Sequence, residues 1–406
     1  MADLVIIGGG HAAGQACASL RAGGWSGAII VVGEEPYPPY QRPPLSKAYL
    51  RGELPAERLL FRPESFYTDH DVTLRLGERA LRIDRAARRV ETDRGSLPYD
   101  ALLLATGARP RPLTCAGADL GGVFGLRSIA DVDAIKQRFD SAQHLVIIGA
   151  GYIGLEVAAV AKRRGLNVTV LEAQDRVMSR VTSPLVSDFF TRVHREEGVD
   201  LRLDAQAEAI EGEGAVEAVR LADGTRVPAD LVVYGIGVLP NQGIAAEAGL
   251  ATDNGILVDE NACTEDPAVY AVGDCTNHPN PLLDRRLRLE SVHNALEQAK
   301  TAAAALCGSP KPYAQIPWFW SDQYELKLQT VGLQDGYDAT VVRGAPEARS
   351  FAVFYLAKDS LIAVDAVNEP AAFMAAKKLV GRRVERHLLE DPETSLRDLA
   401  LAAQRG

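Results

Sequence analysis

The chain has 406 residues, of which 47% are hydrophobic and 24% charged, a mixture that excludes a disordered or fibrous protein. Lys and Arg total 44 while Asp and Glu total 54, so the net charge is −10 and general nucleic-acid binding is excluded. The five scattered cysteines include no C-x-x-C pair, so we expect no disulfide framework and no metal site. We also expect no signal peptide and no membrane span, and hence a cytoplasmic protein.

The first predicted element is a strand at residues 4–7 that runs directly into a G-x-G-x-x-A loop. A helix is expected over 14–22 and a second strand over 29–32, which leads to Glu34. In such a βαβ unit, glycines let the backbone approach a pyrophosphate, the helix N-terminus attracts its charge, and the acid accepts hydrogen bonds from ribose hydroxyls. The pattern therefore predicts a dinucleotide site, whose loop residues are Gly8, Gly10, Ala12 and Ala13.

A second unit repeats this order as a full G-x-G-x-x-G after a strand at 145–148. It continues with a predicted helix over 155–164 and a strand over 168–171 that ends at Glu172. The carboxylate of Glu172 suits the ribose 2′-hydroxyl of NAD and repels the 2′-phosphate of NADP. Arg176 and Arg180 follow closely and oppose that preference, but NADH is the favoured cofactor. The loop residues of this second site are Gly149, Gly151, Tyr152, Ile153 and Gly154.

Two dinucleotide sites in one enzyme suggest FAD and a nicotinamide, between which a hydride passes. The apolar run 102–107, which contains Ala105, and the run 269–274, which ends at Asp274, resemble the second and third FAD motifs of two-dinucleotide flavoprotein reductases. The run 231–237, ending at Gly237, is similar to the end of their nicotinamide domain. The nicotinamide unit is thus expected to be inserted into the FAD domain.

These observations predict an α/β fold, with two Rossmann-like dinucleotide-binding domains of the glutathione reductase-like type and a C-terminal α+β domain. The expected domains are a discontinuous FAD domain at 1–108 and 238–310, a NAD domain at 109–237, and a C-terminal domain at 311–406. No cysteine stands between Cys17 and Cys115, where disulfide reductases of this architecture carry reactive thiols. We therefore expect electrons to leave the flavin for an external acceptor.

The C-terminal region has an antiparallel pattern, with strands expected over residues 326–331, 339–342, 351–356 and 361–367. A long helix is predicted over 371–389, with Lys378, Arg382 and Arg386 four residues apart. This basic stripe is a candidate docking site for an acidic protein, although a solvated helix face explains it as well. A second basic cluster comprises Arg285, Arg286 and Arg288.

Four segments carry a family resemblance, namely RPPLSKAYL from Arg42, YIGLEVA from Tyr152, ESVHNALEQA from Glu290 and PWFWSDQY from Pro317. They resemble the oxygenase-coupled, NADH-dependent ferredoxin reductases, a family that includes the putidaredoxin reductase-like and biphenyl dioxygenase ferredoxin reductase-like enzymes. The resemblance implies non-covalent FAD, NADH, and an acidic [2Fe–2S] ferredoxin as the electron acceptor. It further implies that the ferredoxin feeds an oxygenase. A cytochrome P-450-type haem monooxygenase is favoured over a Rieske dioxygenase as that oxygenase. We expect no nucleic-acid or membrane partner, and a monomer.

The same resemblance implies roles for individual residues. Lys47 is expected beside the flavin, in an ion pair with Glu156 near the nicotinamide, and Tyr152 is expected to shield the flavin until nicotinamide displaces it. The Trp320 ring is expected against the flavin edge, although Trp318 and Trp320, which alternate along a strand, are also explained by core packing. Lys47, Glu156 and Trp320 are thus the catalytic candidates. The remaining FAD positions implied are Arg42, Ala80, Arg127, Asp274 and Val292.

An alternative function comes from a different class of protein. Flavoproteins of the apoptosis-inducing-factor type share this architecture and use NADH binding to change conformation in signalling. Cytochrome c reduction by NADH that depends on added ferredoxin distinguishes an electron-transfer enzyme from such a protein.

Overall fold

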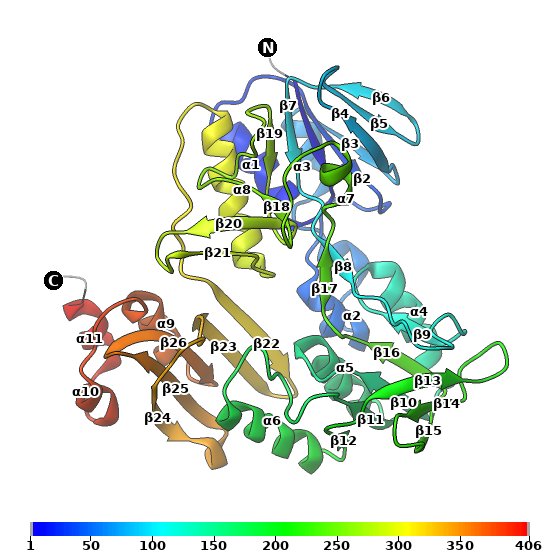
Figure 1. Ribbon diagram of the computed structural model, residues 1–406, viewed down its shortest axis with the longest axis vertical. Helices are drawn as coiled ribbons and strands as arrows, with labels where there is room; N and C mark the ends of the chain where they lie inside the picture. Colours follow the sequence, from blue (N-terminus) through cyan, green and yellow to red (C-terminus); the bar gives the residue numbers. More distant parts are fainter. Residues whose placement is uncertain (1–2, 404–406) are drawn as a thin grey trace. The chain divides into compact units, whose positions relative to one another are not determined.

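The computed structural model describes residues 3–403, and the chain packs as two compact units (Figure 1). Unit 1 combines the chain up to Gln41 with Ala56–Arg109 and Val238–Pro317. Unit 2 combines Arg42–Pro55, Pro110–Gly237 and the chain from Trp318 onward. The division into three domains with boundaries at 108, 237 and 310 stays a prediction.

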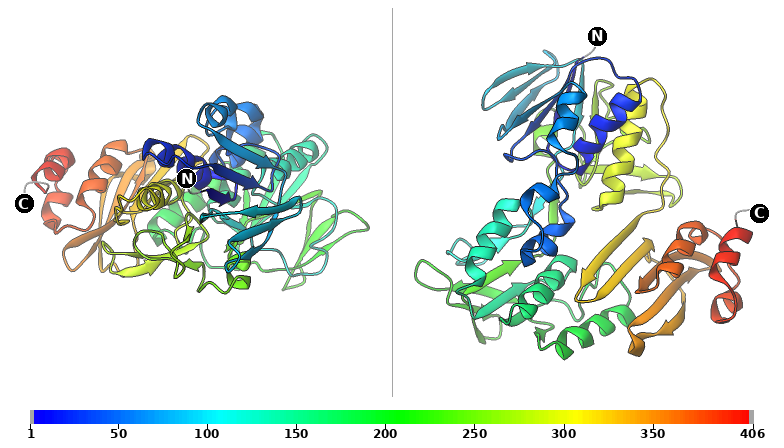
Figure 2. Two further views of the ribbon diagram at one scale, coloured as in Figure 1. Left: turned by 90° about the horizontal axis from the view of Figure 1, so that it is seen from above. Right: turned by 180° about the vertical axis from the view of Figure 1, so that it is seen from behind.

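Unit 1 is built on a parallel sheet with strand order β19–β7–β1–β2–β3. The residues of β1 alternate between two cores: Leu4 and Ile6 pack with α1 and α8, whereas Val5 and Ile7 pack with the antiparallel β4–β5–β6 sheet. The helices α1 and α8 lie side by side (Figures 1 and 2). The elements are β1 (Leu4–Ile7), α1 (His11–Ala22), β2 (Ile29–Gly33), β3 (Val72–Leu76), β4 (Ala80–Asp84), β5 (Arg89–Thr92), β6 (Gly95–Pro98), β7 (Ala101–Leu104), β19 (Val269–Ala271) and α8 (Val292–Leu306).

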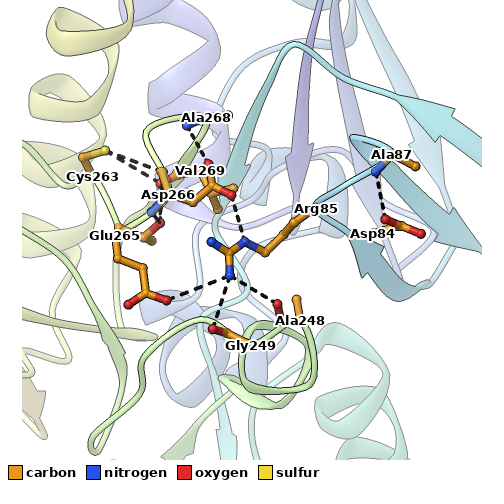
Figure 3. Close-up of polar contacts among 11 residues, drawn as sticks. Asp84, Arg85, Ala87, Ala248, Gly249, Cys263, Glu265, Asp266, Ala268 and Val269 are labelled. Atoms are coloured by element: carbon orange, nitrogen blue, oxygen red, sulfur yellow. Dashed lines mark hydrogen bonds and ion pairs between the residues drawn. The ribbon is translucent and has the colours of Figure 1, made fainter.

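Arg85, just after β4, fastens this hairpin sheet to the rest of unit 1 (Figure 3). Its Nε donates to Asp266 Oδ2 at 2.8 Å, and its Nη1 donates to the carbonyl oxygen of Gly249 at 3.3 Å. Asp266 precedes β19, so this contact fixes the strand that leads to Asp274. The other elements of unit 1 are η2 (Ala56–Leu59), α3 (Glu64–Asp69), α7 (Gly243–Glu247), β18 (Ile256–Leu257), β20 (Thr276–Asn280) and β21 (Arg285–Leu287). The chain passes between the units at β8 (Ala108–Pro110) and β17 (Val238–Pro240).

Unit 2 contains a second parallel sheet, with strand order β12–β11–β10–β16–β9. Alternate residues of the central strand β10, Val146 and Ile148, pack with the antiparallel β13–β14–β15 sheet. The elements are β9 (Val123–Gly125), α4 (Ile129–Phe139), β10 (His144–Ile148), α5 (Tyr152–Arg163), β11 (Asn167–Leu171), α6 (Pro184–Glu196), β12 (Asp200–Arg202), β13 (Ala207–Glu211), β14 (Ala218–Leu221), β15 (Arg226–Pro228) and β16 (Leu231–Tyr234).

The segment Arg42–Pro55 also packs in unit 2, as η1 (Pro43–Ser46) and α2 (Ala48–Arg51). The hydroxyl of Tyr49 donates to Asp133 Oδ1 on α4 at 2.8 Å, and Lys136 lies over the same ring at 4.4 Å. These contacts hold the RPPLSKAYL motif against α4 and α5.

The C-terminal part of unit 2 is an antiparallel sheet with strand order β22–β23–β26–β25–β24. Its helices follow the last strand and gather near the C-terminus (Figure 1). The elements are β22 (Trp318–Gln323), β23 (Leu326–Gly332), β24 (Ala339–Ala345), η3 (Pro346–Ala348), β25 (Ser350–Ala357), β26 (Ser360–Val367), α9 (Pro370–Leu379), α10 (Arg386–Glu390) and α11 (Leu396–Ala402).

The long helix predicted over 371–389 is wrong. Helix α9 ends at Leu379 because Val380 adopts an extended conformation with ψ 133° and Gly381 follows in a left-handed one with φ +87°. The next residues pair with the β25–β26 hairpin instead, where the amide of Leu361 donates to the carbonyl of Arg382 at 2.9 Å. Arg386 begins the separate helix α10 and forms an ion pair with Glu390 at 2.6 Å. The basic residues 378, 382 and 386 therefore do not form a stripe on one helix.

The predicted fold class is otherwise confirmed. Each parallel sheet carries a glycine loop at the end of its central strand, and an antiparallel sheet with helices follows. Within residues 3–403, no helix is both long and apolar enough to cross a bilayer.

Candidate active site

The first glycine loop, in unit 1, is packed tightly at one end and open at the other. Gly8 has φ +116°, and a Cβ there would stand 2.1 Å from the carbonyl oxygen of Ala105, so the close approach of β1 to β7 requires glycine. Gly10 has φ −98°, and a Cβ on it would have nothing within 4 Å. The loop thus leaves free space at the start of α1, where the sequence predicts a pyrophosphate.

The helices after both glycine loops begin without side-chain caps. Helix α1 has Gly10 as its N-cap and α5 has Gly151, with no side-chain hydrogen bond and no acidic residue in either first turn. By contrast, Ser128 caps α4 and Ser291 caps α8. The first N–H groups of α1 and α5 therefore remain for a negatively charged ligand, as the phosphates of FAD and a nicotinamide nucleotide require.

Several predicted FAD positions come together around α1 in unit 1. The end of β19 reaches α1 and α8, since a Cβ on Gly273 would be 3.5 Å from that of Ala12 and 3.7 Å from that of Ala295. This places Asp274 beside the two helices, and Val292 begins α8 one turn before Ala295. The side chain of Ala13 is fully buried in the core, so this residue can contact a ligand only through its backbone.

Glu34 and Ala80 lie at the other side of the glycine loop. Glu34 follows β2 and is exposed, and its Oε1 lies 3.8 Å from Nε of Arg79. Ala80, the next residue after Arg79, begins β4. These two predicted FAD positions are therefore neighbours in unit 1.

The second glycine loop, in unit 2, shows the same combination of tight and open glycines. A Cβ on Gly149 would be 2.7 Å from the carbonyl oxygen of Gly235, and one on Gly154 would be 2.1 Å from that of Gly149. A Cβ on Gly151 would have no neighbour closer than 4.0 Å. The third glycine thus allows the helix to approach the strand, and the second faces open space, as a dinucleotide loop requires.

Glu172 is held in a fixed orientation at the end of β11. Its Oε2 accepts a hydrogen bond from the amide of Ala150 at 2.7 Å, and its Oε1 accepts one from the amide of Gln174 at 3.0 Å. Each carboxylate oxygen retains a further lone pair for a ribose hydroxyl. The acid is therefore tied to the glycine loop itself.

The two arginines that follow Glu172 have different surroundings. Arg176 donates to the carbonyls of Thr182 at 2.7 Å and Ser179 at 2.6 Å and to Ser187 Oγ at 2.9 Å, so it stabilises its own loop and is committed to these bonds. Arg180 is exposed, and its Nη2 lies 3.3 Å from where a Cβ on Gly237 would be. Of the two cations, only Arg180 is exposed to solvent. It lies beside Gly237, a predicted nucleotide-binding residue.

Lys47 and Glu156 form a buried ion pair inside unit 2. Lys47 Nζ lies 2.7 Å from Glu156 Oε2, and the two side chains are 13% and 3% exposed. Ser46 Oγ donates to the same Oε2, and Ser321 Oγ donates to Oε1 at 2.6 Å. The carboxylate therefore has a cation and two hydroxyl donors, which together offset the cost of burying its charge.

Three aromatic residues on β22 divide between its two faces. The rings of Trp318 and Trp320 lie 5.7 Å apart on one face, as predicted from their alternation, and Lys377 Nζ lies 4.0 Å above the Trp318 ring. On the other face, Phe319 contacts Tyr152 with ring centroids 4.6 Å apart. The Tyr152 loop is thereby packed against β22, while the expected contact of Trp320 with the flavin stays a prediction.

Arg42 and Arg127 are brought together in unit 2. Nη1 of Arg42 donates to the carbonyl oxygen of Arg127 at 2.7 Å, and the amide of Arg127 donates to Asp131 Oδ2 at 3.0 Å. The guanidinium of Arg42 thus steadies the loop before α4 that carries Arg127.

The chain matches two family models, one described as pyridine nucleotide-disulphide oxidoreductase over residues 2–299 and one described as reductase C-terminal over residues 318–400. Rhodocoxin reductase of Rhodococcus erythropolis is 46% identical, with 99% of this chain and 95% of that protein covered. The 5,5'-dehydrodivanillate O-demethylase ferredoxin reductase subunit of a Sphingobium species is 45% identical, with 98% of each chain covered. The solved covalent putidaredoxin reductase–putidaredoxin complex matches with TM-score 0.96 and 44% identity, over 100% of this chain and 99% of that one. The chain belongs to the pyridine nucleotide-disulphide oxidoreductase family. The full-length similarity to proteins named as reductases also confirms the resemblance to ferredoxin reductases that the motifs indicated.

As a member of the pyridine nucleotide-disulphide oxidoreductases, the chain is an oxidoreductase with FAD and NADH as cofactors. Its own thiols differ from what the family name suggests, because all five cysteines are free in the structure. Cys17 on α1 is buried, and burial raises the pKa of its thiol to about 12. Such a thiol is protonated at neutral pH and is a poor redox group.

The sequence reasoning missed the two serines that bind Glu156. Ser46 stands next to Lys47 in RPPLSKAYL, and Ser321 follows Trp320 in PWFWSDQY. A pattern was available for Ser321, because polar residues at 321 and 323 alternate with the tryptophans and so share the opposite face of β22. Ser46 had no local pattern of this kind, since its partner is 110 residues away.

Proposed function

We propose that this protein is an FAD-dependent NADH:ferredoxin oxidoreductase that supplies electrons, through an acidic [2Fe–2S] ferredoxin, to an oxygenase. The observation that carries the proposal is the full-length similarity to proteins named ferredoxin reductases, in a chain with two open glycine loops and no dithiol among its free cysteines. Bound FAD supplies the link between a two-electron donor and a one-electron acceptor, because it takes up a hydride and releases electrons singly.

In unit 1, the N–H groups of the Gly8–Gly10 loop and of α1 bind the FAD pyrophosphate, Glu34 binds the adenosine ribose, and Asp274 binds the ribityl chain. This assignment is supported by the uncapped start of α1 and by the packing of Gly273 against Ala12. The predicted flavin contacts Arg42, Lys47 and Arg127 belong to unit 2 and stay predictions.

In unit 2, the loop from Gly149 to Gly154 binds the pyrophosphate of NADH and Glu172 binds its adenosine ribose. The Lys47–Glu156 ion pair orients the nicotinamide for hydride transfer. Tyr152 shields the flavin until the nicotinamide displaces it. The burial of the pair supports this proposal. Removing two opposite charges from water has a considerable cost in solvation, so a buried ion pair is weak evidence for stability alone and favours a role in the reaction.

A ferredoxin-dependent assay tests the proposal. NADH is expected to drive cytochrome c reduction only when a [2Fe–2S] ferredoxin is added, and to reduce ferricyanide without it. Flavin absorbance that is released on denaturation verifies that FAD is bound non-covalently. Cytochrome c reduction that proceeds equally fast without ferredoxin, or no NADH-driven reduction of any acceptor, would contradict the proposed function.

The finer assignments concern the partners and location of the enzyme. The final acceptor is proposed to be a cytochrome P-450-type haem monooxygenase, which the motif ESVHNALEQA favours. The enzyme is proposed to act as a monomer in the cytoplasm, where a reducing environment suits five free cysteines.

The enzyme is expected to prefer NADH to NADPH by more than about a hundredfold in kcat/KM. Repulsion of the 2′-phosphate and lost hydrogen bonding at Glu172 should cost NADPH a few kcal/mol, and each 1.4 kcal/mol is tenfold. The fixed carboxylate of Glu172 provides that repulsion, and Arg176 cannot relieve it because it is bound to its own loop. Glu172→Gln should reduce the preference strongly, while Arg180→Leu should leave it in place. Equal kcat/KM values for NADH and NADPH in the wild-type enzyme, with a preference for NADH that emerges only in Arg180→Leu, would show that Arg180 decides the cofactor choice instead.

A further inference from the structure

A row of buried polar side chains extends from Glu156 within unit 2. Ser321 and Gln323 lie on one face of β22 and are 0% and 1% exposed, and His194 on α6 is 0% exposed. None of the three is part of the predicted nucleotide loops. Polar groups are costly to bury without partners, so each of these side chains needs a hydrogen bond within the protein.

The row forms a continuous series of hydrogen bonds. Ser321 Oγ lies 2.6 Å from Glu156 Oε1, and Gln323 Nε2 lies 3.2 Å from Ser321 Oγ. His194 Nε2 lies 2.9 Å from Gln323 Oε1, and the hydroxyl of Tyr324 lies 3.3 Å from His194 Nδ1. Five residues from α5, β22, the turn after β22 and α6 are thereby joined in series.

The hydrogen bonds in this series can run in one direction only. The carboxylate of Glu156, paired with Lys47, can only accept, so the single hydroxyl hydrogen of Ser321 is used on it. Ser321 must then accept from Gln323, which places the amide nitrogen of Gln323 on Ser321 and its oxygen on His194. His194 must therefore carry its proton on Nε2, and its Nδ1 accepts from Tyr324.

The titratable groups around the row are consistent with this direction. Burial lowers the pKa of His194 to about 4, so its ring is neutral at pH 7 and carries one proton. Burial, together with the nearby Asp365 and Glu156, raises the pKa of Tyr152, and burial likewise raises that of Tyr324, so both hydroxyls keep their hydrogens. Arg163 lies over the Tyr324 ring at 5.7 Å, and Lys47 is the cation at the other end of the row.

We propose that His194 and Gln323 are positioning residues for hydride transfer, which act through Ser321 to hold the Glu156 carboxylate against Lys47. Each donor in the row points toward Glu156, so the hydrogen of Ser321 is directed at the carboxylate, and rotation of the carboxylate breaks that bond. This proposal rests on the proposed function, because it assigns the row to the nicotinamide side of the same site.

Gln323→Glu is the most informative variant, because it replaces the donor to Ser321 with an acceptor. The new carboxylate competes with Glu156 for the Ser321 hydrogen and attracts a second proton to His194. In ¹⁵N-imidazole NMR spectra of the holoenzyme, wild-type His194 should be neutral and protonated on Nε2 from pH 8 to pH 5. In the variant it should become an imidazolium within that range, and flavin reduction by NADH should slow about tenfold at saturating NADH.

Two further variants separate positioning from general stability. Gln323→Met removes the donor without adding charge and should also slow flavin reduction severalfold. Tyr355→Phe is the matched control: its hydroxyl donates to Asp365 Oδ2 at 2.7 Å in the same unit but outside the row. This variant should lower the melting temperature by a similar amount while flavin reduction and the His194 spectrum stay unchanged.

The outcomes distinguish this proposal from the proposed function. A wild-type His194 protonated on Nδ1 would overturn it, even if no variant folds. Unchanged flavin reduction in both Gln323 variants would also overturn it. The proposed function would still hold in that case, provided that the wild-type enzyme reduces ferredoxin. Failure of the wild-type enzyme to reduce any ferredoxin would instead refute the function, and with it any role of the row in catalysis.

Discussion

Gly8→Ala is expected to destabilise unit 1 by more than about 4 kcal/mol and to abolish FAD binding. The new Cβ would stand 2.1 Å from the carbonyl oxygen of Ala105 and 2.6 Å from its carbon, in a backbone conformation with φ +116° that L-residues rarely adopt. Relief would require β1 and β7 to separate, yet Ile7 is paired with Leu104 in the sheet. Thermal unfolding followed by circular dichroism, together with the ratio of absorbance at 450 and 280 nm, measures both effects.

Gly10→Ala is the matched control two residues away. Its Cβ would meet nothing within 4 Å, and φ −98° is ordinary for alanine, so the variant should fold like the wild-type protein. It should nevertheless bind FAD weakly, because the methyl group occupies the space where the pyrophosphate is proposed. Full FAD occupancy in Gly10→Ala would move the phosphate site elsewhere, and a stable, yellow Gly8→Ala would show that β1 and β7 can separate.

The two nucleotide-binding units could be predicted from the sequence because their patterns are local. Glycine spacing, an apolar strand before the loop and an acid after the second strand all lie within about 30 residues of one another. The helix starts were placed three residues late, at Gly14 instead of His11 and at Leu155 instead of Tyr152. The reason is physical: in both loops the second glycine is itself the N-cap, so the helix begins inside the motif.

The errors and omissions arose from contacts between residues far apart in the chain. The break after Leu379 depends on pairing of residues 381–384 with the β25–β26 hairpin, which outweighs the helical pattern of that segment. The binding of Arg176 to carbonyls of its own loop removed one of two cations that appeared to compete with Glu172. The donors to Glu156 come from positions 110 and 165 residues away, so alternation along β22 can place Ser321 on one face of the strand but cannot reveal its contact with Glu156.

Lys47→Met is expected to lower the free energy of unfolding by about 3 kcal/mol, because it leaves the carboxylate of Glu156 buried without a cation. The double variant Lys47→Met/Glu156→Gln should recover most of this loss, since a neutral amide replaces the uncompensated charge. Urea unfolding of the two single variants and the double variant gives the coupling energy between the residues. A surface ion pair serves as the control: Arg386→Met, which removes the partner of Glu390, should change stability by less than about 1 kcal/mol.

Hydride transfer is expected to respond differently from stability in the same variants. If the pair orients the nicotinamide, flavin reduction by NADH should slow by about a hundredfold or more in each single variant, and the double variant should stay slow. Anaerobic stopped-flow absorbance at 450 nm measures this step without any protein acceptor, and Arg386→Met should be as fast as wild type. If the pair serves packing alone, the opposite result is expected, because the double variant would then regain its rate of flavin reduction together with its stability. The double variant therefore decides whether the buried charges of Lys47 and Glu156 serve the reaction or only the fold.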